Sequence, residues 1–145
     1  MSRLDGIIRL YKWELDEKRR ELVDLQEQVD RVQEQIEMLH QEVEDQKQHA
    51  ATEAGLTTMG AYLEGVRKRE QMLRSELRKR EEAVAKQQER VSEAFSELKT
   101  YEIARDKEKA RQVAKVAKVE QAEFDEQGLR RSSQRDASQH PQRKR

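Results

Sequence analysis

Two long stretches of this chain carry apolar residues at alternating intervals of four and three positions, the spacing typical of a coiled-coil seam. The first seam comprises Leu4, Ile8, Tyr11, Leu15, Leu22, Leu25, Val29, Val32, Ile36, Leu39, Val43 and Ala50. The second comprises Met59, Leu63, Val66, Leu73, Leu77, Val84, Val91, Ala94, Leu98 and Tyr101. Lys18 and Gln46 interrupt the first seam, and Glu70, Arg80 and Gln87 interrupt the second. The pattern predicts two long α-helices, each with one narrow apolar stripe.

The two seams match each other if the chain folds back on itself. In an antiparallel pair each a position faces a d position. If Ala50 faces Met59, every layer obeys this rule and no layer is polar on both sides. Leu15 then meets Ala94, and Gln87 meets Leu22. This match favours an intramolecular hairpin over an extended parallel dimer, with paired arms roughly 70 Å long at 1.5 Å per residue.

The sequence therefore predicts an all-α protein, a long antiparallel two-helix coiled-coil hairpin over residues 1–128. Gly55 marks the connection, since glycine is common just after a helix end. The second helix is longer and should overhang the first by roughly 30 Å. The expected boundaries are a helix at about 3–51, a turn at about 52–58, a helix at about 59–125, and a disordered basic tail at 129–145.

Composition supports long exposed helices and not a compact globule. Charged residues make up 41% of the 145 residues and apolar residues 34%, which is low for a single packed core. Residues 4–50 hold 13 acids and 7 bases, whereas residues 59–125 hold 14 acids and 16 bases. This contrast favours pairing of the two arms. No run of about 18 apolar residues exists, so we expect no integral membrane segment.

Several apolar residues fall outside the seams, and two groups of them are candidate partner-binding sites. Near the open end, where the first helix begins, these are Ile7, Leu10, Trp13, Phe95, Ile103, Val113 and Phe124. Near the tip, where the chain turns, they are Met38, Tyr62 and Met72. Exposed apolar residues of this kind mark interfaces. Two interpretations stay open for the open end: anchors for a partner, or residues covered by a third helix or a second copy.

No pattern of catalytic or cofactor-binding residues is found. No second histidine lies three or four residues from His40, His49 or His140, and the chain has no cysteine to complete a zinc site. No phosphate-binding glycine motif occurs, so we expect no nucleotide hydrolysis, no cofactor and no enzyme. The basic C-terminus lacks accompanying aromatic residues, so we expect no nucleic-acid binding.

The chain resembles the FliJ family, the coiled-coil component of the bacterial flagellar type III export ATPase complex. The resemblance covers roughly residues 4–131. It rests on the segments IIRLYKWELDEKRRELVDLQ, AYLEGVRKREQMLRSEL, AFSELKTYEIARDKEKAR and EQAEFDEQGLRR. The last of these ends a charged stretch with the acidic pair Asp125 and Glu126.

The resemblance implies a hairpin similar to the gamma subunit of ATP synthase, located in the cytoplasm and peripherally at the membrane of the flagellar base. It implies three partners: the export ATPase hexamer, the membrane export gate protein and export chaperones. The ATPase would use the open-end residues, and the gate would use Met38, Tyr62 and Met72. The alternatives are a stalk, scaffold or chaperone-like coiled coil of a virulence-type secretion system, or a generic coiled-coil adaptor.

Overall fold

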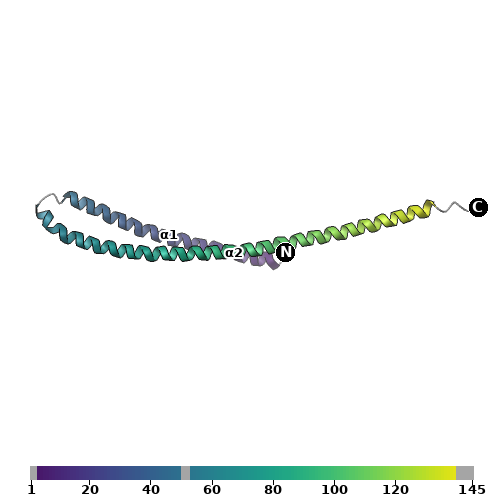
Figure 1. The fold of residues 1–145 in the computed structure, drawn as a ribbon, viewed down its shortest axis with the longest axis horizontal. Helices are drawn as coiled ribbons and strands as arrows, with labels where there is room; N and C mark the ends of the chain where they lie inside the picture. Colours follow the sequence, from purple (N-terminus) through teal and green to yellow (C-terminus); the bar gives the residue numbers. More distant parts are fainter. Residues whose placement is uncertain (1–2, 50–52, 140–145) are drawn as a thin grey trace, which may run out of the picture.

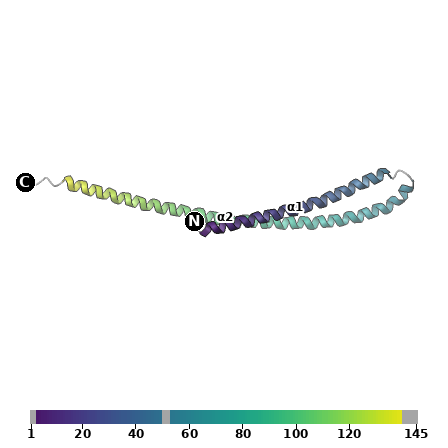
Figure 2. The same cartoon turned by 180° about the vertical axis from the view of Figure 1, so that it is seen from behind.

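The computed structural model describes residues 3–49 and 53–139, and these form two long α-helices that lie antiparallel (Figure 1). Helix α1 spans Arg3–His49 and α2 spans Glu53–Gln139. Both views show α1 running back along the first half of α2, while the second half of α2 extends alone (Figure 2). The predicted all-α, antiparallel two-helix hairpin with an overhanging second helix is confirmed.

The buried side chains of the described residues all occupy the predicted seam positions. Every seam side chain from Leu4 to Val43, and from Val66 to Tyr101, is buried or half-buried. The buried set is Ile8, Leu15, Val32, Ile36, Leu39, Gln87, Ala94 and Leu98. None of them is large and completely enclosed, because a two-helix rod has only one layer of contacts. The 4-3 spacing therefore predicts the core of the hairpin.

Polar bonds between the helices show that the expected register is also present. Arg80 donates a hydrogen bond to Gln28, next to its expected partner Val29. Gln87, expected opposite Leu22, donates to the Lys18 carbonyl at 3.0 Å and to the Glu21 carboxylate at 3.1 Å. Polar seam residues are thus paired inside the rod, which supports their expected role in specifying register.

The best-packed part of the hairpin lies at its open end. Ile8 and Leu15 of α1 form a buried cluster with Ala94 and Leu98 of α2. Tyr11 and Tyr101, which pack against this cluster, stack with ring centroids 4.8 Å apart. Offset stacking of this kind adds to the stabilisation from burial alone. The start of α1 is therefore held firmly against the middle of α2.

The boundaries near the tip differ from those expected. Helix α2 begins at Glu53, so the predicted turn at 52–58 is wrong for residues 53–58, and Gly55 lies inside a helix. No described glycine has a positive φ, so none needs a turn conformation. Glycine in a helix costs only about 1 kcal/mol, so one glycine is too weak a signal to end the helix. Ala50 and the rest of the connection fall outside the described residues.

The pairing loosens before it reaches the connection. Gln46 and Leu63, which face each other in the expected register, are both exposed. A layer with one polar member gains little from burial, and it lies close to the ends of both helices. The tip is therefore the less tightly packed end of the hairpin.

Helix α2 also continues past its expected end at about 125 and stops at Gln139. Residues 129–139, which we expected in the disordered tail, are helical; residues 140–145 lie outside the described part. An Arg130–Glu126 pair at 3.1 Å supports the extra turns. Gly128 alone is too weak a signal to end the helix.

We call residues 105–139 the overhang, because they begin at the level of Leu4, in the first turn of α1, and extend beyond it. At 1.5 Å per residue the overhang is roughly 50 Å long, compared with the roughly 30 Å expected. Every residue from 109 to 137 is exposed. The hairpin therefore continues into a single helix that no other described residue covers.

Glu70 is a charged residue placed in the seam, and its partners explain why it is tolerated there. Its Oε1 atom lies 2.7 Å from His40 Nε2 across the interface and accepts hydrogen bonds from Arg74 of its own helix at 3.0 and 3.1 Å. The bond to His40, followed by that to Arg74, lowers the pKa of the Glu70 carboxyl, while partial burial opposes the shift. Glu70 is therefore held in its charged form.

Leu98→Ala should destabilise the hairpin by about 2–3 kcal/mol, because it leaves a cavity in the best-packed cluster. Val113→Ala on the overhang, where Val113 is 70% exposed, should change stability by no more than about 0.5 kcal/mol. Urea denaturation followed by circular dichroism measures both. Equal effects of the two substitutions would contradict the assigned core.

Glu70→Gln should lower stability at neutral pH, because it removes a charge that is favoured in the folded state. Since the folded pKa of Glu70 lies below the ordinary value of 4.5, its contribution is present above that pH and disappears as the pH falls through the folded pKa. The stability difference between wild type and variant should therefore narrow below about pH 4.5. Thermal unfolding between pH 7 and pH 3 tests this, and a constant difference would contradict the role of the charge.

Candidate functional site

The described residues contain no group of three or more His, Cys, Asp or Glu side chains that could hold a metal ion. His40 is bound to Glu70, and Nδ1 of His49 lies 2.7 Å from the Asp45 carbonyl; His140 is outside the described residues. None of the described helices is long and apolar enough to cross a membrane. The candidate sites predicted from the sequence are exposed apolar surfaces, at the open end and at the tip.

At the open end, α1 presents three apolar side chains beside the buried cluster. Ile7, Leu10 and Trp13 are 37%, 54% and 60% exposed. They occupy heptad positions g, c and f, so they lie progressively farther from the seam. Because the neighbouring residues Ile8, Tyr11 and Leu15 pack against α2, the backbone carrying these side chains is fixed. Trp13 is thus an exposed aromatic residue on a rigid support, as expected of an anchor.

Phe95 lies at the same level of the rod but on α2. It is 44% exposed, and Lys99 Nζ lies 5.4 Å from its ring centroid. Phe95 occupies an e position and Ile7 a g position, and in an antiparallel pair these positions flank opposite sides of the seam. The apolar residues at this level therefore surround the rod and do not form one flat patch. A partner that contacts all of them must enclose the open end.

The overhang carries the rest of the predicted open-end residues. Ile103 lies just before it and is 53% exposed, while Val113 and Phe124 are 70% and 73% exposed. From Phe95 to Phe124 the helix rises roughly 44 Å, so these residues form a long stripe and not a compact site. Three further apolar residues are exposed on the overhang: Val116, Val119 and Leu129. Leu129 was absent from the predicted set because we placed it in the tail.

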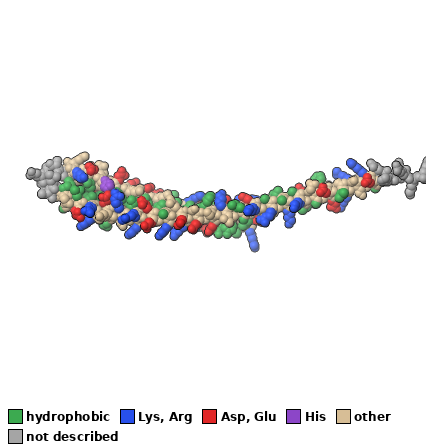
Figure 3. Space-filling view, viewed as in Figure 1, with side chains coloured by type: hydrophobic (Ala, Val, Ile, Leu, Met, Phe, Trp, Pro, Cys, Tyr) green, Lys and Arg blue, Asp and Glu red, His purple; other side chains and the backbone are tan. Residues whose placement is uncertain are grey.

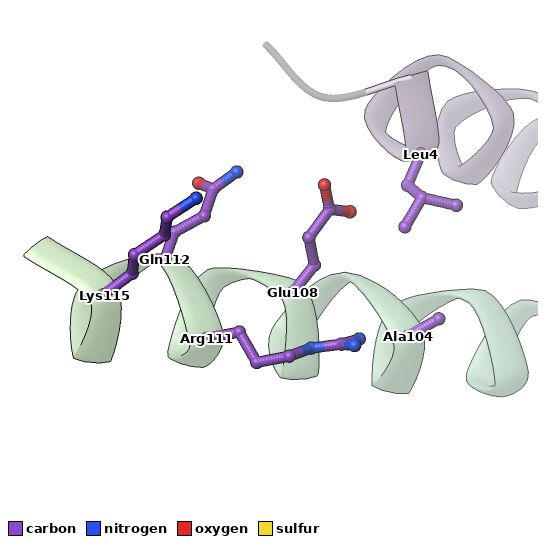
Figure 4. Close-up of a pocket in the computed structure, with 6 residues that line it drawn as sticks. All are labelled: Leu4, Ala104, Glu108, Arg111, Gln112 and Lys115. Atoms are coloured by element: carbon purple, nitrogen blue, oxygen red, sulfur yellow. The ribbon is translucent and has the colours of Figure 1, made fainter.

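A notch marks the place where α1 begins and where α2 continues past it without a partner helix (Figure 4). Leu4 of α1 lies over Ala104 and Glu108 of α2 and closes the hairpin core there. Beyond Leu4 the seam positions of α2 become polar, with Glu108 followed by Gln112 and Lys115. The apolar seam of α2 thus stops at the level where α1 begins. The sequence predicts this change, but not the notch itself.

At the tip, the structure treats the three predicted residues differently. Met38 and Met72 are 70% and 74% exposed, whereas Tyr62 is half-buried. The Tyr62 hydroxyl is buried and has no hydrogen-bond partner in the described part of the chain. Burial, and then the charge of Glu42, raise the pKa of this hydroxyl. Tyr62 occupies a g position beside the seam, which explains why less of it is available than of the two methionines.

A shallow groove runs beside Met38 on the tip half of the hairpin. It is lined by Met38, Leu39, Glu42 and Asp45 of α1 and by Arg69 of α2. Methionine is flexible and polarisable and suits surfaces that accept varied partners. The groove and the exposed methionines make the tip half a second candidate binding surface.

Comparison with known proteins identifies one family. The family described as "Flagellar FliJ protein" matches residues 1–137, which is nearly the whole chain and includes both helices. No curated protein and no solved structure gives a match. The match includes the segments on which the resemblance rests.

Proposed function

The chain belongs to the flagellar FliJ protein family, whose members are components of the flagellar export apparatus, and from this premise we propose that it links the export ATPase hexamer to the membrane export gate. It does so without catalysis of its own, as a rod with one binding surface at each end. The proposal places it in the cytoplasm, peripherally attached to the membrane at the flagellar base. Export chaperones are further partners in this proposal.

The observation that carries the proposal is the contrast between the paired and the single part of the rod. A hairpin stiffened by a buried seam ends in a bare helix of roughly 50 Å. Around that junction lie Trp13 and Phe95, with Val113 and Phe124 farther out, all of them exposed. A ring-shaped ATPase offers a central opening that can enclose such an end. This arrangement supports assigning the open end to the ATPase.

The tip half supports the second contact. Met38 and Met72 are the two most exposed large apolar side chains on the paired part of the rod, within the described residues. They lie far along the rod from Trp13, so both ends can be occupied together. A rod with two separate ends suits a coupling component.

Trp13→Ala combined with Ile103→Ala should weaken binding to the export ATPase by about tenfold or more. Both side chains are more than half exposed in the free protein, and truncating interface anchors typically costs this much. Helicity should not change, because neither residue lies in the core. Calorimetric titration with the purified ATPase measures the affinity, and circular dichroism measures the helicity.

Val23→Ala is the matched control, because Val23 is 52% exposed but lies away from both ends of the hairpin. It should bind the ATPase as the wild type does. Unchanged affinity in the double variant would show that the open end is not the ATPase-binding surface.

Met38→Ala with Met72→Ala should reduce binding to the cytoplasmic part of the export gate protein several-fold while ATPase binding stays at the wild-type level. The expected loss reflects removal of two exposed apolar side chains from one surface. Parallel pulldowns with gate fragment and ATPase test the separation of the two sites. Loss of both interactions would argue against distinct ends.

A further inference from the structure

The overhang carries a narrow stripe of exposed residues that α1 leaves uncovered. At 100° per residue, eight positions lie within about 60° of one another around α2. They are Asp106, Ala110, Val113, Ala117, Phe124, Gly128, Arg131 and Arg135, and all of them are exposed. The space-filling view shows hydrophobic and charged side chains at the surface along this part of α2 (Figure 3). The centre of the stripe is turned about 120° away from the seam that holds α1, so another helix can pack on it while the hairpin stays closed.

The spacing of the stripe is a palindrome. Its successive intervals are four, three, four, seven, four, three and four residues. If two overhangs run antiparallel with Ala117 opposite Phe124 of the second copy, every stripe position therefore faces another stripe position. The overlap covers residues 106–135, which is about four heptads and long enough for a coiled coil. Such an interface is symmetric, as expected for two identical chains.

The residues that meet in this register are complementary in size. The large Phe124 faces the small Ala117, and Val113 faces Gly128. A side chain has room to approach Gly128, because no heavy atom lies within 4 Å of the place where its Cβ would be. Pairing of large with small side chains lets the two helices interdigitate. The apolar centre of the stripe can therefore pack against itself.

The charges of the stripe and of one flank also match in the antiparallel direction. At the ends of the stripe, Asp106 faces Arg135. About 90–110° from the centre of the stripe, Lys107 and Lys118 precede Asp125 and Asp136, and all four are exposed. The antiparallel pair places Lys107 near Asp136 and Lys118 near Asp125, each twice by symmetry. In a parallel pair every one of these charges would lie beside its own copy.

The other flank opposes pairing and limits its strength. Glu120, next to the centre of the overlap, lies beside its own copy, and Lys109 lies near Arg131. Like charges at such positions destabilise a helix pair by a few tenths of a kcal/mol each, about as much as opposite charges stabilise it. The remaining charged residues of the overhang lie farther around the helix. The balance favours a weak and reversible pair.

We propose that the overhang is a self-association surface, through which two copies of the chain pair antiparallel with Ala117 opposite Phe124. This inference goes beyond the proposed function and does not depend on it. The pair would cover Val113 and Phe124, which the proposed function assigns to the ATPase. Self-association and ATPase binding would therefore compete for the same side chains.

Exchange of one charge pair tests the inference. Lys118→Glu places like charges together twice in each dimer and should raise the dimer Kd about tenfold. Adding Asp125→Lys restores opposite charges and should return the Kd to near the wild-type value. A partner with its own fixed surface would instead bind the double variant no better than the single one. Sedimentation equilibrium at low salt, from micromolar to submillimolar concentration, measures the Kd.

Lys115→Glu is the matched control, because it makes the same charge change on an exposed residue about 170° from the centre of the stripe. It should dimerise as the wild type does. Circular dichroism checks helicity, which matters because Asp125 accepts a hydrogen bond from Gln121 at 3.1 Å on its own helix. A wild-type chain that stays monomeric at submillimolar concentration would overturn the inference, as would a double variant that keeps helicity but does not regain pairing.

Crosslinking tests the direction of pairing without altering any charge. The chain has no cysteine, so Val113→Cys and Gly128→Cys each introduce a single thiol. A short bismaleimide should link the two variants when they are mixed, and should link neither variant to itself. In the antiparallel pair the two copies of position 113 are roughly 22 Å apart along the axis. Links within each variant alone would show a parallel dimer and contradict the inference, while ATPase binding, measured separately, would leave the proposed function standing.

Discussion

The packing of α1 against α2 through a single row of apolar layers is the interaction on which the whole molecule depends. Each layer contributes two side chains, and no other described element adds to them. Stability is therefore distributed along the rod and concentrated where layers are well filled, around Leu15 and Leu98 at the open end. The polar layers weaken this core but give it a register. A shift of one heptad would separate Gln87 from Lys18 and Glu21 and leave its buried amide unpaired.

A core this narrow leaves most of both helices free for partners. The charged residues that cover the rod form mainly local pairs within one helix, such as Arg74–Glu70 and Arg130–Glu126. Against this background the exposed aromatic and aliphatic residues stand out because the fold does not need them. The backbone that carries Trp13 is held by the buried neighbours Ile8 and Leu15, while the Trp13 side chain is exposed. A rod of this kind holds exposed side chains at defined distances from one another, which suits the coupling role proposed above.

The seam, the hairpin and the register could all be predicted from the sequence, because a 4-3 spacing and the a-with-d rule restrict the possible pairings severely. The ends of α2 could not. Gly55 and Gly128 suggested boundaries, yet the helix continues through both, since one glycine opposes a helix too weakly. Tyr62 shows a second limit of prediction from the sequence. Its heptad position, g, does not determine how much of the side chain is buried against the seam. The heptad spacing identifies which surfaces are candidates for binding, but not which proteins bind them. The exposure of a side chain depends on this chain alone, whereas the identity of a binding partner depends on the partner's own surface.

Helix α1 begins at Arg3, and the thickness of the rod changes abruptly at that level. A single helix is about 10–12 Å wide, and a second helix packed beside it adds another 8–10 Å. An opening wide enough for the thin part but not for the thick part would admit the rod until Leu4 reached its rim. The first turn of α1 would then act as a shoulder that sets how far the protein can be inserted. Length beyond the shoulder, and not only affinity, would decide which level of a surrounding ring the last helical residues can reach.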